Sequence, residues 1–272
     1  DRPNRNRIDL KRRRLLSTGG YAALAVAGAS SGLWPQGAFA QPKRGGMLRV
    51  AKGHGSTSDS LDPGLATNGF MTATLHGMYG HLTGFGRDGA IEGELAESWE
   101  ATPDAKIWRF KLRNGVTFHN GKSLTTEDVI ASINHHRGEK STSAAKPLVA
   151  SVVDELEAGN ADFPATFTNY QFGIGPATDG VVDWSAGIGA GPYKLLEFNP
   201  GVVARFERFE NDWNQDRGWI QEIEMLSVID GNARTSALLS GEVDAIDKIE
   251  LKTAALFGRN PGVNLHSVAG NQ

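Results

Sequence analysis

Apolar and basic residues alternate along residues 107–113. Trp108, Phe110 and Leu112 alternate with Ile107, Arg109, Lys111 and Arg113, of which only Ile107 is apolar. A period of two is typical of a strand with one buried face, so we expect these three side chains to point inward. Asn-Gly dipeptides at 114–115 and 120–121 favour turns on either side of a second short strand, 116–118. The pattern therefore predicts a β-hairpin.

A helix is predicted directly after this hairpin, over residues 127–137. We expect Thr126 to be its N-cap, because a Thr hydroxyl can accept a hydrogen bond from a free N–H group of the first turn. Glu127 and Asp128 follow it, and acidic residues are favourable at a helix N-terminus. The whole stretch has a structural explanation and shows no catalytic pattern.

Strands and helices interleave along the rest of the chain without a strict repeat, which indicates an α/β or mixed fold. The predicted strands are 45–51, one within 163–174, 193–198, 202–209, 222–229 and 243–246. The predicted helices are 71–81, 232–240 and 252–257, with Gly241 at the C-terminal end of the second. Residues 54–68 are expected to form a polar loop, and 149–157 are ambiguous between helix and strand.

Composition limits the classes of function. The chain has 272 residues and 39% hydrophobic content, enough for a sizeable core in one or two domains. A net charge of −3 provides no global basic field for nucleic acid. The absence of cysteine excludes disulfides, thiol nucleophiles and metal sites with cysteine ligands within this sequence.

The N-terminal segment has the order of features of a secretory signal. Basic residues that include Arg12-Arg13 precede an apolar stretch, 21–29, and Ala38-Phe39-Ala40 fits an A-x-A cleavage site. The arginine pair indicates the twin-arginine route, with a Sec signal as the alternative. The apolar stretch is too short for a transmembrane anchor, which needs about 20 residues. We expect residues 1–40 to be removed.

The sequence contains no recognisable catalytic or metal-binding pattern. His76 and His81 are five residues apart and would not share a helix face. His135 and His136 are adjacent and are expected to point apart. Gly187, Gly189 and Gly191 are similar to a phosphate loop, but a predicted strand follows them, so we interpret these glycines as a turn. No metal ligands, cofactor site or catalytic residues are predicted.

Three blocks of sequence resemble one family. They are LAESWE with WRFKLRNGVTFHNG and TTEDV in 95–129, GAGPYKL to RFENDW in 189–213, and ARTSALLSGEVD in 233–244. In this order they resemble the extracellular solute-binding proteins of the peptide/nickel class, the receptor subunits of ABC importers. The resemblance implies an α/β fold of two lobes, of the type II periplasmic-binding-protein kind, that closes on a ligand by a hinge motion.

The same resemblance implies the function and location. We expect a soluble periplasmic receptor, a monomer, that binds peptides or similar small solutes and delivers them to permease and ATPase subunits at the inner membrane. No enzyme activity and no nucleic-acid partner are expected. Two alternatives stay open: a nickel-chelate or other solute receptor, and a secreted enzyme with an unrecognised carboxylate site.

The resemblance also implies a domain organisation. After the signal, residues 41–250 would form the first lobe, with a small subdomain at about 115–185, and 251–272 would begin a second lobe that is incomplete at the C-terminus. The segment 149–160 is shorter than the family pattern. Trp99 and Trp108 are expected in the core, Trp213 is expected to be structural, and His119 is expected in a turn.

The loop after the first strand faces the ligand cleft in this family. Here that loop contains short polar side chains suited to hydrogen-bonding a ligand, namely Ser56, Thr57, Ser58 and Asp59. We therefore predict these four residues as ligand-binding, with an ordinary solvated turn as the alternative interpretation.

Overall fold

The computed structural model describes residues 43–86, 88–150, 163–250, 253–254, 257, 260 and 262–266. Contacts divide the chain into two units, Asp1–Gln41 and Pro42–Gln272, and every described residue belongs to the second. The predicted signal, the segment 151–162 and half of the predicted helix 252–257 lie outside the described residues. Within the described part, no helix is both long enough and apolar enough to cross a membrane.

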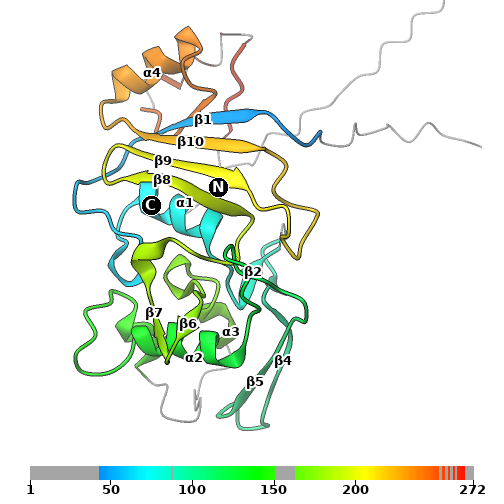
Figure 1. The fold of residues 1–272 in the computed structure, drawn as a ribbon. Helices are drawn as coiled ribbons and strands as arrows, with labels where there is room; N and C mark the ends of the chain where they lie inside the picture. Colours follow the sequence, from blue (N-terminus) through cyan, green and yellow to red (C-terminus); the bar gives the residue numbers. More distant parts are fainter. Residues whose placement is uncertain are drawn as a thin grey trace, which may run out of the picture. The chain divides into compact units, whose positions relative to one another are not determined.

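A five-stranded sheet forms the upper part of this unit in Figure 1. Its strands, in spatial order, are β11 (Ala245–Ile246), β1 (Met47–Lys52), β10 (Glu222–Ser227), β9 (Val203–Arg208) and β8 (Tyr193–Asn199). β1 runs parallel to β10 and β11, and the β10–β9 and β9–β8 pairs are antiparallel. The strands predicted at 45–51, 193–198, 202–209, 222–229 and 243–246 are confirmed, and so is the hairpin 193–209.

Helix α1 (Gly69–Met78) packs on this sheet and buries its apolar side chains against it. The shared core includes Phe70, Met71, Leu75 and Met78 from the helix and Ala204, Phe206 and Met225 from the strands. Helix α4 (Gly231–Ser240) lies beside β11. It ends at Gly241, whose φ of 77° is the left-handed conformation predicted at this position.

A second core lies below the sheet in Figure 1, among shorter elements. These elements are β2 (Thr83–Phe85), β3 (Ile91–Gly93), β4 (Ala96–Ala101), β5 (Trp108–Leu112), α2 (Thr126–His135), α3 (Phe163–Thr166), β6 (Ala177–Thr178) and β7 (Val181–Val182). Short 3-10 helices occupy Pro63–Leu65, Lys146–Val149, Tyr170–Phe172 and Trp184–Ala186. Phe118, Phe163, Phe167 and Phe172 are buried in this core.

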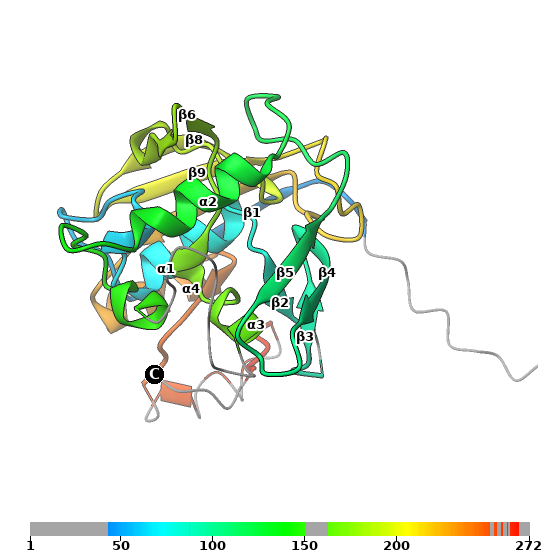
Figure 2. The same cartoon turned by 90° about the horizontal axis from the view of Figure 1, so that it is seen from below.

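The predicted strand 107–113 is confirmed as β5, but its predicted partner is wrong. β5 pairs with the preceding strand β4, in a hairpin that Figure 2 shows to one side of α2. Residues 116–118 instead fold back on the next few residues, where the Leu124 N–H donates to the Val116 carbonyl at 3.0 Å. Gly115, at φ 78°, turns the chain out of the hairpin before those residues could extend it.

The alternation along β5 is confirmed. Trp108, Phe110 and Leu112 are half-buried against the second core, while Arg109 and Lys111 are exposed. Trp99 on β4 is half-buried and packs on Phe110, with 6.3 Å between ring centroids.

Two predictions of local structure need correction. The N-cap of α2 is Thr125 rather than Thr126, because Asp128 reaches back and accepts hydrogen bonds from both the N–H and the hydroxyl of Thr125. The segment 163–174 holds α3 and a 3-10 helix instead of a strand. Pro164 has no N–H to give to a sheet, and the Asn169 side chain caps the 3-10 helix at Gln171.

Candidate functional site

The C-terminal ends of three parallel strands meet at one edge of the main sheet, and the loops that follow them gather there. Because β1 is parallel to β10 and β11, the segments after each strand emerge on the same side. Open α/β sheets bind ligands at such an edge. An open depression with a volume of about 330 Å³ lies here. Its lining residues are Gly53, His54, Gly55, Ser56, Ser58, Asp59, Leu65, Thr67, Asn68 and Ile229.

Three of the four predicted ligand-binding residues line this depression, and Thr57 does not. Their polar groups are largely engaged within the loop itself. Asp59 accepts a hydrogen bond from the Ser56 N–H at 2.9 Å, and the hydroxyls of Ser56 and Ser58 are 2.8 Å apart. The loop is thus a preorganised polar turn whose hydroxyl groups keep the capacity for a further hydrogen bond.

Asn68 ties this loop to helix α1. Its side-chain amide donates to Asp59 at 2.5 Å, and its side-chain oxygen accepts from the N–H groups of Phe70 and Met71. Asn68 was not among the predicted site residues, although an Asn before an apolar helical pattern is an N-cap signal. Leu65 and Ile229, which are 49% and 69% exposed, provide apolar walls beside these polar groups.

His54 lies between α1 and the segment after β11. Its Nδ1 accepts a hydrogen bond from the Gly69 N–H at 3.2 Å, and its Nε2 faces the Lys248 Nζ at 2.5 Å. Gly69 leaves room for the ring, because a Cβ there would lie 2.7 Å from the His54 Nδ1.

Arg234 fastens the loops on the other side of the depression. Its guanidinium is buried and donates to four backbone carbonyl oxygens, those of Val228, Ile229, Asp247 and Lys248. Gly53 packs directly on it, since a Cβ at Gly53 would lie 2.9 Å from the Arg234 Cζ. One side chain on α4 therefore sets the spacing of the segments that follow β1, β10 and β11.

Asp247 adds a second link between these segments. Its carboxylate accepts from the Gly53 N–H at 2.6 Å and pairs with the Lys52 ammonium at 2.6 Å. Burial acts to raise the pKa of Asp247, but these two hydrogen-bond partners outweigh burial and hold its pKa below the usual value.

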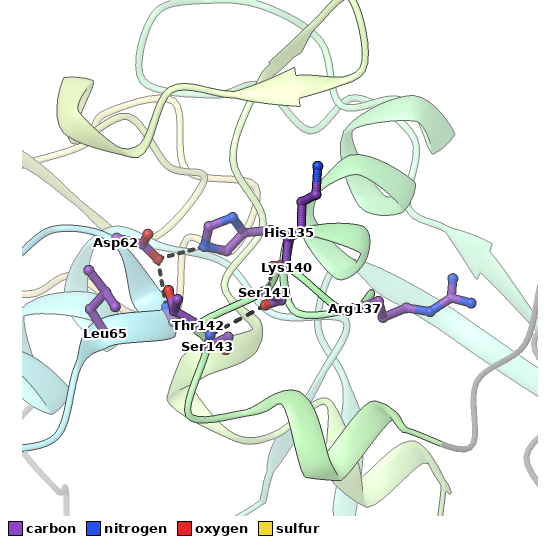
Figure 3. A pocket seen from close by; sticks show the side chains of 9 residues that line it. Asp62, Leu65, His135, Arg137, Lys140, Ser141, Thr142 and Ser143 are labelled. Carbon is purple, nitrogen blue, oxygen red and sulfur yellow. Dashed lines mark hydrogen bonds and ion pairs between the residues drawn. The ribbon is translucent and has the colours of Figure 1, made fainter.

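A second depression, of about 300 Å³, borders the first at Leu65 (Figure 3). His135 donates from Nε2 to Asp62 at 2.7 Å when it is protonated there, and Asp62 also accepts from the Gly64 N–H at 2.8 Å. Burial acts to raise the pKa of Asp62, yet the hydrogen bond and charge of His135 lower it overall. In Figure 3, Lys140 and Arg137 point in different directions away from this pair, so no convergent ion site forms.

The histidines partly contradict the predictions. His76 and His81 were expected to lie on different helix faces, but their rings stack with centroids 5.0 Å apart, because α1 ends at Met78 and His81 lies beyond it. His135 and His136 have different hydrogen-bond partners, Asp62 and Ser143, but their rings meet edge to face with centroids 5.1 Å apart, so the expectation that they point apart is wrong. In the part of the chain that the structure describes, no three His, Asp or Glu side chains are arranged to hold a metal ion.

The glycines at 187–191 form a close-packed turn, as predicted. The Gly191 N–H donates to the Met78 carbonyl at 2.9 Å, and a Cβ on Gly189 would lie 2.1 Å from that same oxygen. His119 holds the turn from the other side: its Nδ1 accepts from the Gly189 N–H, and its Nε2 lies 3.0 Å from the Gly191 carbonyl. The backbone N–H groups of Gly189 and Gly191 are thus hydrogen-bonded within the protein and are not available to bind a phosphate.

A sequence model of the bacterial extracellular solute-binding proteins, family 5 (middle region), matches residues 90–272. The chain belongs to this family. Among curated family 5 proteins, the glutathione-binding protein GsiB of Pectobacterium atrosepticum is 26% identical over 223 residues, which is 76% of this chain and 43% of GsiB. GsiB of Escherichia coli O1:K1 is also 26% identical, over 233 residues, with 78% of this chain and 44% of GsiB covered.

Solved structures agree on the fold. The binding protein AgaA from A. tumefaciens R10, solved with agropinic acid, has a TM-score of 0.71 and 28% identity, covering 79% of this chain and 46% of AgaA. A dipeptide-binding protein from Pseudoalteromonas sp. SM9913, solved with Met-Leu, has a TM-score of 0.70 at 17% identity. The match covers 79% of this chain and 50% of the dipeptide-binding protein. The chain thus has part of the expected type II periplasmic-binding fold and spans about half the length of its family 5 relatives.

Proposed function

We propose that this protein is the substrate-binding component of an ABC importer. Membership of solute-binding family 5 carries the proposal, and the depression where the β1, β10 and β11 loops meet is the ligand site that it requires. A receptor needs a concave surface with a few placed polar groups and no nucleophile. The lining of this depression, with Ser56, Ser58, Asp59 and Asn68 between apolar Leu65 and Ile229, has that composition.

The proposed ligands are peptides or similar small solutes. GsiB is named for glutathione, a peptide, and the two structural relatives above were solved with agropinic acid and with Met-Leu. A nickel-chelate receptor and an enzyme are the weaker alternatives. Ser143 and His136 are hydrogen-bonded to each other through their side chains, and both are buried.

The remaining parts of the proposal follow the family. The receptor is exported by the signal at 1–40, acts as a monomer in the periplasm, and passes its ligand to permease and ATPase subunits. The described loops provide one wall of the site, and closure of a second lobe over that wall would exclude water from the ligand.

Calorimetric titration of the protein with di- and tripeptides tests this function. Saturable binding, together with a rise of the melting temperature in the presence of ligand, is the expected result. Ser58→Ala should weaken binding without changing stability, whereas Asp59→Ala should change both, because Asp59 also anchors Asn68. If neither Ser58→Ala nor Asp59→Ala changes the affinity, the ligand site lies elsewhere.

A further inference from the structure

Asn-Gly is a reactive pair as well as a turn signal, and the sequence contains it three times, at 68–69, 114–115 and 120–121. The backbone nitrogen of the glycine can attack the side-chain amide carbon of the asparagine, because glycine has no Cβ to hinder the approach. The reaction requires that the asparagine side chain is free to rotate and that the glycine N–H is free to lose its proton. The structure shows which of the three pairs meets these conditions.

The pair at 68–69 is held by hydrogen bonds on both sides. The Asn68 side-chain nitrogen donates to Asp59, and its oxygen accepts from N–H groups in the first turn of α1. The Gly69 N–H donates to the His54 Nδ1 at 3.2 Å. Both reacting groups are therefore engaged, and the attack would have to break the N-cap of α1.

The pair at 120–121 is exposed, but hydrogen bonds hold it as well. The Asn120 side-chain oxygen accepts from the Lys122 N–H at 3.0 Å, and the Gly121 N–H donates to the Phe118 carbonyl at 2.8 Å. The first bond fixes the orientation of the amide group that would be attacked. The second bond keeps the proton on the nitrogen that would attack. Exposure alone thus does not make this pair reactive.

The pair at 114–115 lacks both restraints. Within the part of the chain that the structure describes, neither the Asn114 side chain nor the Gly115 N–H makes a hydrogen bond, and both residues are exposed. Gly115 and Gly121 are otherwise alike, with φ of 78° and 85° and no atom within 4 Å of an added Cβ. The two turns differ in their hydrogen bonds, so Asn120 is an internal control for Asn114.

We propose that Asn114 is a site of spontaneous deamidation. The Gly115 nitrogen forms a bond to the Asn114 Cγ, and the bond from Cγ to Nδ2 breaks. Ammonia leaves with the proton of the Gly115 nitrogen, and a succinimide ring remains. Water then opens the ring at either of its carbonyl carbons, which gives aspartate or isoaspartate. The sequence of steps uses only water and releases only ammonia, and both products carry a carboxylate in place of a neutral amide.

The modification falls where β5 leaves its hairpin. The Arg113 N–H donates to the Leu95 carbonyl at 2.8 Å, and the Arg113 Nε donates to the Glu94 carbonyl at 2.9 Å. The Arg113 Cζ also lies 4.1 Å from the centroid of the Trp213 ring. Isoaspartate lengthens the main chain directly after this anchored arginine, and either product places a negative charge beside it. Deamidation of Asn114 therefore distinguishes an aged form of the protein from the form first made.

The first experiment compares the three pairs in one sample. The full chain is incubated in mildly alkaline buffer, folded or in urea, and tandem mass spectrometry of a digest measures deamidation at each asparagine. In the folded protein Asn114 should react roughly tenfold or more faster than Asn120, because reaction at Asn120 first has to break two hydrogen bonds. In urea the two rates should become similar. Similar rates in the folded protein, or the same ratio of rates in urea, would overturn the proposal.

The second experiment uses the change of charge. Anion-exchange chromatography should resolve a more acidic form that accumulates with time, and Asn114→Asp should elute with the aspartate product. Asn114→Gln should prevent most of this accumulation, because glutamine would have to close a less favourable six-membered ring. Asn120→Gln is the matched control and should leave the accumulation unchanged. If the acidic form accumulates equally in Asn114→Gln and wild type, the proposal is wrong. Neither experiment depends on the receptor function.

Discussion

The contact between Gly53 and Arg234 shows how one missing side chain positions the candidate site. Any Cβ at residue 53 would press on a guanidinium that is already hydrogen-bonded to four carbonyl groups and cannot move freely. Gly53→Ala should therefore destabilise the fold by about 1–3 kcal/mol, as for overpacking of a close contact. Urea unfolding measures this change.

Gly77 is the matched control. It lies inside α1, and no neighbouring atom comes within 4 Å of the position that an alanine Cβ would take, so alanine has free space there. Gly77→Ala should stabilise the protein by about 0.5–1 kcal/mol, because alanine is the better helix residue. We therefore expect the free energy of unfolding to fall in Gly53→Ala and to rise in Gly77→Ala. A destabilised Gly77→Ala would contradict the argument from contacts.

His119 provides a residue-scale test of burial. Burial lowers its pKa to about 4, from 6.5 for the unfolded chain. The unfolded state then binds more protons between pH 6.5 and 4, so stability falls as the pH decreases through this window. From pH 7 to pH 5 the loss attributable to His119 should be about 2 kcal/mol.

The pH effect is isolated by comparing wild type with His119→Gln in urea at pH 7 and pH 5. His119→Gln should lose less unfolding free energy than wild type when the pH falls from 7 to 5. His136, with a pKa lowered to about 4 by burial, and Glu94, whose pKa burial raises, titrate in both proteins and so cancel in the comparison. An identical pH dependence in the two proteins would show that His119 is not buried in the neutral form.

At the scale of elements, the start of α2 distinguishes two neighbouring threonines. Thr125 is hydrogen-bonded to Asp128 through both its N–H and its hydroxyl. Thr125→Ala should cost about 1 kcal/mol, in the range for a lost N-cap, and Thr126→Ala less than about 0.5 kcal/mol. Thermal unfolding of the two variants measures the difference, and the reverse order would restore the N-cap predicted from sequence.

Alanine substitutions on the two faces of β5 should also differ in how much they destabilise the protein. Trp108 packs on Phe163 with 6.3 Å between ring centroids, and its Nε1 donates to the Ala105 carbonyl. Since it is only half-buried, Trp108→Ala should cost about 2–3 kcal/mol, below the ~3–5 kcal/mol typical of a fully buried Trp. Arg109→Ala should cost less than about 1 kcal/mol, because its ion pair with Glu100 is exposed. If Trp108→Ala and Arg109→Ala reduced the stability equally in denaturant unfolding, the alternation of buried and exposed side chains along β5 would be refuted.

These elements also show what sequence patterns can and cannot predict. Periodicity located β5, β10 and α4 because the signal lies within a few neighbouring residues. It did not identify β4 as the partner of β5, because strand pairing depends on which segments meet in space. The segment 163–174 was assigned to a strand because aromatic and β-branched residues occur in both kinds of element, and Pro164 was the overlooked signal against it.

At the scale of the whole molecule, the candidate site was predicted only in part. The loop after β1 was found through the family resemblance, and three of its four residues line the depression. His54, Ile229 and Arg234 were not found, because their roles depend on contacts between loops that no local sequence pattern predicts. His54 meets Lys248 across 194 residues, and no local pattern records such a contact.

The position of β1 in the sheet has a consequence for the order of events during synthesis. β1 is made first among the strands of the main sheet, yet both of its neighbours, β10 and β11, come near residues 222–227 and 245–246. At ribosomal rates of about 5–20 residues per second, roughly ten seconds or more separate the appearance of β1 from that of its neighbours. Throughout this interval the nascent chain presents β1 with both edges unpaired, and any chaperone or export factor that engages the chain then meets an open strand rather than a finished sheet.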